Sequence, residues 1–173
     1  MHKDAILSDC EKFRYSLTRT WDSTLPIACF VMLNPSTADA AEDDQTIRKC
    51  VGFADRQGFG GFVAVNLFAF RTTFPIELKK AGYPIGEEND FHLEMAVREQ
   101  TDAVICAWGS NARKLQRPTE VLQMIRSWNR KPLALSLLGD GTPAHPCMLG
   151  YTDTWIEIDT GIRNRVQPIR DPA

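Results

Sequence analysis

The sequence has little of what marks a secreted or membrane protein. Its apolar runs are short, and none approaches the roughly 20 residues that a helix needs to span a bilayer. The segment MHKDAILSDCEK at the N-terminus contains no apolar core followed by a cleavage site. We therefore expect a cytoplasmic protein that does not bind a membrane.

The marks of disulfide frameworks, metal sites and cofactor sites are also missing. The five cysteines are scattered and form no CxxC pair, so reduced thiols are expected. No P-loop occurs, and no arrangement of serine, histidine and aspartate stands out. The segment GFGG, residues 58–61, fits a helix end and a tight turn better than a phosphate-binding loop. The sequence predicts neither a metal nor a cofactor.

Charge of one sign is not in excess either. The formal net charge is −2 and the sequence pI is about 5.9, which argues against a protein that coats nucleic acid through charge alone. The hydrophobic content is 43% and the charged content 24%, as in ordinary globular proteins. The chain of 173 residues contains no repeat and no linker, so we expect one domain over residues 1–173.

What is present is an alternation of strand-like and helix-like segments. Continuous apolar runs predict strands buried on both faces, at 26–33, 61–70, 102–108 and 131–138. Alternating patterns predict two more strands, at 13–21 and 154–159. Helical periodicity and end signals predict helices at 44–57, 91–99 and 118–128, and leave 71–90 as the longest loop. This order predicts the α/β class, with a three-layer α/β/α sandwich around a mainly parallel sheet.

Polar groups and aromatic rings follow these strands, at the edge where their carboxyl ends meet. They are Asn34, Pro35, Ser36, Thr37, Asn66, Phe68, Arg71, Trp108, Gly109, Ser110 and His145. In an open parallel sheet, ligands bind outside this edge. Amides read donors and acceptors, and aromatic rings cover flat faces. The combination is typical of a site for a flat, polar, uncharged ligand such as a nucleobase.

The same residues also have purely structural interpretations. Asn34 before a proline is a common way to open a turn, and Asn66 would also suit a turn or cap. Trp108 fits packing better than stacking. Asp43 and Asp44 fit the N-terminus of a helix, where negative charge is favourable, with metal binding or a catalytic carboxylate as alternatives.

Several segments in order resemble a known family. They are RYSLTRTW, FVMLNPSTADA, DDQTIRKC, VNLFAFR and the late HP pair. Across the whole chain these look like a bacterial and phage family, the domain-of-unknown-function family sixteen-forty-three. That resemblance implies membership of a family but no established activity.

A more distant resemblance is to the uracil-DNA glycosylase superfamily. Four motifs are similar and occur in the same order, namely LNPST, GFVAVNLFAFR, VICAWGSNARK and HPCML. Each lies at or near the end of a predicted strand. The resemblance implies the fold of that superfamily and a site for nucleobase chemistry.

This resemblance also implies roles for single residues. Asn34, at the place of the catalytic Asp or Asn, would position or polarise the attacking water. Asn66 would hydrogen-bond the base edge, and His145 would donate to the base oxygen that gains charge as the glycosidic bond breaks. Asp44, or the acid before it, could activate the water, because an amide does not readily accept a proton. Leu149 would fill the gap left by an extruded base.

The motifs depart from the superfamily at two places. The residues after Pro35 are serine and threonine instead of the usual Gly or Tyr, and the HP loop lacks its second proline. Phe68 and Phe70 are the candidates for the aromatic ring that stacks on the base. We predict an N-glycosidase-like enzyme that acts on a nucleobase, nucleotide or nucleic acid. The alternatives are a non-catalytic nucleotide or nucleic-acid binder on the same fold, and a protein-interaction module.

Overall fold

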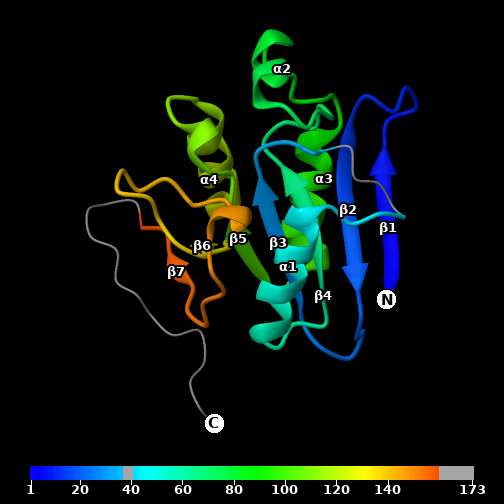
Figure 1. Ribbon diagram of the computed structural model, residues 1–173, viewed down its shortest axis with the longest axis vertical. Coiled ribbons are helices and arrows are strands. Elements are labelled where there is room, and N and C mark those ends of the chain that lie inside the picture. Colours follow the sequence, from blue (N-terminus) through cyan, green and yellow to red (C-terminus); the bar gives the residue numbers. More distant parts are fainter. Residues whose placement is uncertain (37–40, 160–173) are drawn as a thin grey trace.

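The computed structural model describes residues 1–36 and 41–159. Within them one sheet is formed in the order β1-β2-β4-β3-β5-β6-β7 (Figure 1). The strands are β1 (His2–Leu7), β2 (Arg14–Thr20), β3 (Ile27–Met32), β4 (Gly61–Asn66), β5 (Ala103–Cys106), β6 (Pro132–Ala134) and β7 (Ile156–Glu157). The described residues therefore form a mixed α/β fold around this sheet.

The middle of the sheet is parallel and its edges are antiparallel. β3 pairs in parallel with β4 on one side and with β5 on the other, so that Val31 lies opposite both Val65 and Cys106. β6 continues the parallel part beside β5, whereas β1, β2 and β7 pair in the antiparallel sense. The mainly parallel sheet expected from the sequence is thus a mixed sheet with a parallel centre. Its strand order reverses at β3, which is where open α/β sheets bind ligands.

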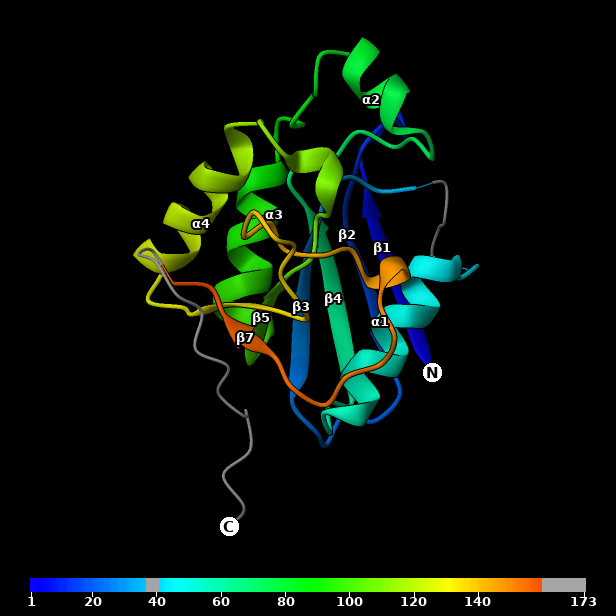
Figure 2. The ribbon, with the colours of Figure 1, turned by 60° about the vertical axis from the view of Figure 1, so that its left-hand side comes forward.

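Helices cover both faces of the sheet. α1 (Gln45–Arg56) covers one face, and α3 (Asn89–Met95) and α4 (Arg117–Ser127) cover the other (Figures 1 and 2). Two buried apolar clusters separate the layers. One includes Cys50 and Phe53 of α1, and the other includes Leu93 of α3 and Ile125 of α4. The strands between them are apolar on both sides, which is why their sequences read as continuous apolar runs.

The ends of α1 are set by short-range signals that are legible in the sequence. The carboxylate of Asp44 caps the helix by accepting a hydrogen bond from the backbone N–H of Ile47 at 2.8 Å. The helix ends before Gly58, whose φ of +77° belongs to the left-handed region. The predicted helix at 44–57 thus matches α1 almost residue for residue.

Two predicted boundaries are wrong and two elements were missed. The segment 71–90, predicted as a loop, contains α2 (Pro75–Lys80), which begins at a proline and ends before Gly82. β1 was not predicted, because its short sequence mixes polar and apolar residues without a clear strand pattern. In the structure it pairs with β2 at the edge of the sheet. β4 and β6 are shorter than their apolar runs, since the residues beyond Asn66 and Ala134 leave the sheet.

No helix in the described ranges is both long and apolar enough to cross a membrane.

Candidate functional site

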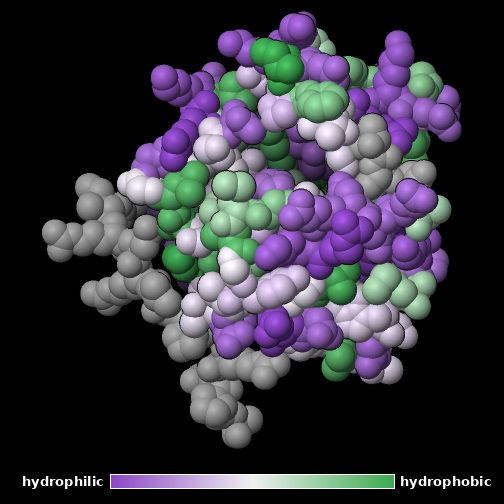
Figure 3. Space-filling view, viewed as in Figure 1, coloured by the Kyte–Doolittle hydropathy of each residue, from purple (hydrophilic) through white to green (hydrophobic). Residues whose placement is uncertain are grey.

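A cavity of about 650 Å³ lies at the carboxyl ends of the parallel strands. It opens between α2 and α1 on the face seen in Figure 3. Its walls come from the segments after β3, β4, β5 and β6 and from the start of α1. The polar residues of the wall are Arg14, Asn34, Ser36, Asp44, Gln45, Thr46, Thr72, Thr73, Ser110, Asn111, Arg113, His145 and Cys147. A volume between roughly 300 and 1,000 Å³ is usual for a small-molecule site.

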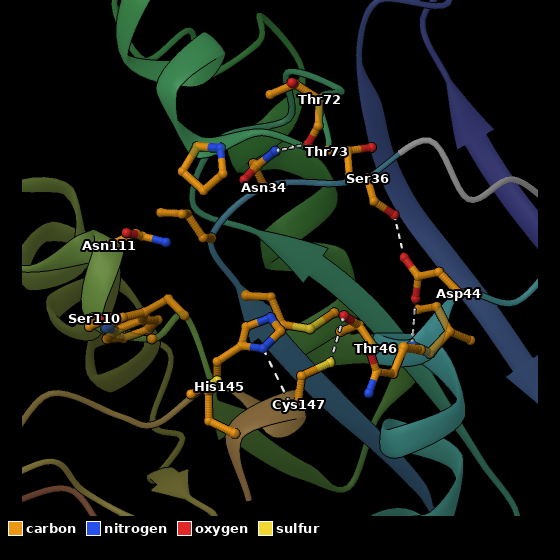
Figure 4. A pocket seen from close by; sticks show the side chains of 18 of the residues that line it. Asn34, Ser36, Asp44, Thr46, Thr72, Thr73, Ser110, Asn111, His145 and Cys147 are labelled. Carbon is orange, nitrogen blue, oxygen red and sulfur yellow. Dashed lines mark hydrogen bonds between the residues drawn. The ribbon is translucent and has the colours of Figure 1, made fainter.

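Asn34 is held in one orientation by the backbone around it. Its Nδ2 donates to the carbonyl oxygen of Thr72 at 2.8 Å, with further contacts to those of Pro35 at 3.1 Å and Phe70 at 3.4 Å. These acceptors fix which end of the amide is the amino group. Figure 4 shows the amide on the upper wall of the cavity, between α2 and the labelled His145. Its oxygen is the atom that is left to accept a hydrogen bond from a ligand or water.

Asp44 places a carboxylate on the neighbouring wall. One oxygen caps α1 through Ile47, and the other accepts a hydrogen bond from the hydroxyl of Ser36 (Figure 4). Among the described residues it is the only carboxylate in the cavity wall. Asp43 serves elsewhere, since it pairs with Arg19 at 2.7 Å and with Lys3 at 3.2 Å. The structure thereby distinguishes two acids that the sequence left as alternatives.

His145 faces the cavity from the opposite wall to Asn34 (Figure 4). Its Nδ1 accepts a hydrogen bond from the backbone N–H of Cys147 at 3.3 Å. In a neutral ring the proton therefore sits on Nε2, which becomes a donor. Burial lowers the pKa of His145, and the nearby charge of Asp44 opposes that effect only in part. The site holds a neutral imidazole with one donor nitrogen.

Gly109 sets the position of this histidine. Its φ is +77°, and a Cβ atom there would lie 2.9 Å from Cβ of His145. Its backbone N–H donates to the carbonyl of Pro143 at 3.0 Å, which ties the turn after β5 to the loop that carries the histidine. Only a glycine combines this backbone conformation with so close an approach.

The lowered pKa of His145 predicts a dependence of stability on pH. In the unfolded chain the pKa of histidine is about 6.5, and in the fold it is lower. Below about pH 6.5 the unfolded state therefore binds more protons, so stability falls as the pH decreases towards the folded pKa. We expect the melting temperature of the wild type to fall more between pH 7.5 and 5 than that of His145→Gln. Equal slopes would contradict this, and His2→Gln, at an exposed histidine, is the control.

Several predicted site residues lie outside the cavity. Phe68 is buried and packs on Tyr83, with the ring centres 5.4 Å apart. Arg71 donates through Nη1 to the backbone carbonyl of Glu11 at 3.0 Å. Pro35 is buried beside the cavity and contributes its carbonyl to Asn34, and Thr37 lies outside the described residues.

Leu149 and Asn66 do not line the cavity either. Leu149 packs against the core on the α1 side, and its carbonyl accepts a hydrogen bond from Nζ of Lys49 at 2.7 Å. The residue that stands at the cavity rim is instead Met148, which is 81% exposed. Asn66 is fully buried opposite Met32, and within the described ranges neither atom of its amide has a hydrogen-bond partner.

The structure also brings residues to the cavity that sequence reasoning did not select. Arg14, at the start of β2, is only 2% exposed and lines the cavity. Thr72, Thr73, Asn111 and Cys147 come from turns after β4, β5 and β6. Most of these residues follow a predicted strand, and that position in the sequence would have indicated them as site candidates. Arg14 carries no such signal, because it is the first residue of its strand and does not follow one.

Trp108, Gly109 and Ser110 do line the cavity as predicted, and Trp108 is packed in the apolar cluster of α3 and α4 at the same time. No group of three or more His, Cys, Asp or Glu residues that would suit a metal ion occurs in residues 1–36 and 41–159.

Fold and cavity together define an α/β protein with a pocket of mixed polar and apolar lining at the carboxyl edge of its parallel strands. The chain belongs to the family described as Protein of unknown function (DUF1643), whose profile matches residues 14–147. The predicted family is thus confirmed, and the matched segment runs from Arg14 to Cys147, both of which line the cavity. Neither a curated protein nor a solved structure matches the chain. The resemblance to the uracil-DNA glycosylase superfamily stays a prediction.

Proposed function

We propose that the cavity binds the nucleobase of a nucleoside, nucleotide or nucleic acid and that the protein hydrolyses the N-glycosidic bond. The observation that carries this proposal is the placement of Asn34 and a neutral His145 on opposite walls of one cavity, with Asp44 beside them. An acceptor for water on one side and a donor for the leaving group on the other are what the reaction requires. The resemblance to glycosylase motifs points to the same two residues.

Water would be positioned by Asn34 and deprotonated by Asp44. The oriented amide oxygen of Asn34 accepts a hydrogen bond from water and directs its lone pair at the sugar carbon. As the new C–O bond forms, one water proton passes to the hydroxyl of Ser36. The proton of that hydroxyl passes along its existing hydrogen bond to Asp44. Asn34 itself needs to accept no proton in this scheme.

His145 would stabilise the departing base. The electron pair of the glycosidic bond moves into the base, whose carbonyl oxygen gains negative charge. The Nε2–H of a neutral imidazole donates to that oxygen, and the hydrogen bond strengthens as charge develops. The hydrogen bond from Cys147 to Nδ1 keeps the donor proton on Nε2. The lowered pKa of His145 leaves the ring uncharged near neutral pH.

The proposal is tested by base release from labelled single- and double-stranded DNA that contains uracil, hypoxanthine or mismatched bases. Free nucleosides and nucleotides are assayed in parallel. We expect Asn34→Ala and His145→Ala each to lower the rate by about 10²–10³-fold, the usual cost of removing one such group. Asp55→Ala, at an exposed carboxylate of α1 outside the cavity, is the control and should keep full activity. Absence of release from every substrate would refute the reaction.

A second candidate is a non-catalytic nucleotide binder on the same scaffold. One observation favours it, namely that both oxygens of Asp44 already accept hydrogen bonds, one of them as the cap of α1. Both oxygens thus already have structural partners, and the carboxylate has a role in the fold without taking up a proton. Tight nucleotide binding without turnover, unchanged by Asp44→Asn, would identify this function.

A further inference from the structure

A second, smaller cavity of about 200 Å³ adjoins the first. Leu33, Pro75 and Asn111 line both, so the two share a wall where the end of β3 meets α2 and the turn after β5. The other lining residues are Ile76, Leu78, Lys79 and Tyr83. We call this smaller cavity the annex. Nothing in the reaction proposed above uses it.

The annex is an apolar slot with an aromatic side wall. Leu33 and Leu78 are buried, and the half-buried ring of Tyr83 packs on the buried Phe68 with 5.4 Å between the ring centres. This contact holds the tyrosine ring in place from behind. A fixed aromatic ring beside buried leucines is suited to a planar group that needs little polar contact.

The backbone of Tyr83 is held in an unfavourable conformation. Its φ is +56°, and it follows Gly82, whose φ is +80°. Its N–H donates to the carbonyl of Leu78 at 3.1 Å, which ends α2. A bulky residue in the left-handed region costs free energy that a glycine would save, and such strain gathers where a ligand is clamped. A tyrosine thus stands at a position whose backbone conformation favours a glycine.

Polar groups and exposed apolar side chains surround the annex. Asn111, on the wall shared with the main cavity, offers an amide, and Lys79 offers a charge at the other side. Ile76, in the wall of the annex, is 57% exposed. Exposed apolar surface next to a pocket is typical of a binding groove that continues outward.

We propose that the annex is a subsite for a second planar ring of the ligand whose base occupies the main cavity. The ring stacks against Tyr83 and lies on Leu33 and Pro75, and Asn111 contacts the ligand where the two cavities meet. This inference rests on the proposed function for the nucleotide nature of the ligand, and it adds that a single nucleotide fills only part of the site. The second ring has two sources, a neighbouring base of a dinucleotide or an aromatic substituent on the same base.

The test compares the affinities of three probes by calorimetry. They are a nucleoside monophosphate, the dinucleotide that contains it, and the same monophosphate with a benzyl group on its exocyclic amine. We expect at least one of the last two to bind the wild type about tenfold more tightly than the first, as one base–aromatic stack would give. The dinucleotide and benzyl arms identify which source of the ring the annex accepts.

Three variants show whether the gain comes from the annex. Tyr83→Gly removes the ring while suiting the positive φ, so the fold is kept and the tenfold gain should be lost. Tyr83→Phe keeps the ring and should keep the gain. Phe91→Ala removes an exposed aromatic side chain outside both cavities and should change nothing.

The outcomes separate this inference from the reaction. Equal affinities of all three probes, or a gain that survives in Tyr83→Gly, would overturn the subsite even where bases are released. A gain that depends on Tyr83 without base release would support the subsite and refute the glycosidase. If none of the probes binds, the subsite is wrong, and the reaction is decided separately by base release from DNA.

Discussion

Replacing Asp43 by alanine is expected to lower the free energy of unfolding by about 3 kcal/mol, as loss of one partner of a buried ion pair does. Its partner Arg19 lies in β2 with no exposed surface, and Nε of that arginine is 2.7 Å from the carboxylate. The backbone carbonyl of Thr18 also accepts from Arg19 but brings no negative charge. Asp43→Ala would therefore leave a buried guanidinium without this carboxylate.

Denaturant unfolding of four variants checks this expectation. Lys3→Ala removes the partly exposed cation on the other side of Asp43 and should cost under about 1 kcal/mol. Asp55→Ala, at an exposed carboxylate, should change stability by less than about 0.5 kcal/mol. The double variant Arg19→Met/Asp43→Leu replaces both charges by apolar groups and should recover most of the loss. A cost for Asp43→Ala as small as that of Asp55→Ala would show that the ion pair contributes little.

The pKa of Asp43 agrees with this interpretation. Burial pushes it upward, but hydrogen bonds and charge from Arg19 and Lys3 outweigh burial and lower it below the usual aspartate value. A carboxyl whose pKa is lowered in the fold contributes stability that is present above the unfolded pKa of about 3.9 and is lost as the pH falls. The cost of Asp43→Ala should therefore shrink below about pH 4.

Asp44→Asn is expected to separate two roles of one residue. Asparagine caps a helix about as well as aspartate, so α1 should persist, with little change in the free energy of unfolding. Asparagine cannot take the proton that Ser36 would deliver, so base release should fall by about 10²–10⁴-fold, the usual contribution of a general base. Asp44→Ala should lose both the activity and about 1 kcal/mol of cap stabilisation.

Melting curves and base-release rates, measured on the same preparations of Asp44→Asn and Asp44→Ala, check both expectations. Thr46→Ala, also in the cavity wall at the start of α1, is the matched control. Its hydroxyl contacts the sulfur of Cys147 at 3.2 Å and has no place in the proton route. If Asp44→Asn keeps the wild-type rate, Asp44 is a helix cap alone and another group removes the proton.

Local elements were largely predictable because their signals are short-range. Apolar runs located β3 and β5, and spacing together with Asp44 and Gly58 located α1. α2 was missed although Pro75 and Gly82 bracket it, since its single buried residue, Leu78, leaves no periodicity to read. Short elements such as α2 and β1 are held by contacts with distant segments, which a local pattern does not encode.

For the site, the sequence by itself determined which residue types follow each strand, and with them most of the polar groups that the cavity offers to a ligand. Only the tertiary structure decided which of them face it. Asn34 and His145 do, whereas Asn66 is buried in the core and Phe68 lies behind Tyr83. Side chains alternate between faces, so where a strand ends decides whether the next residue meets ligand or core. Tyr83 reaches its place by packing against Phe68, from another turn of the chain. Arg14 is held by a hydrogen bond from its backbone N–H to the carbonyl of Ala69, in the segment after β4. Such contacts depend on how distant segments of the chain pack together. Local sequence patterns therefore do not predict that Tyr83 and Arg14 line a cavity.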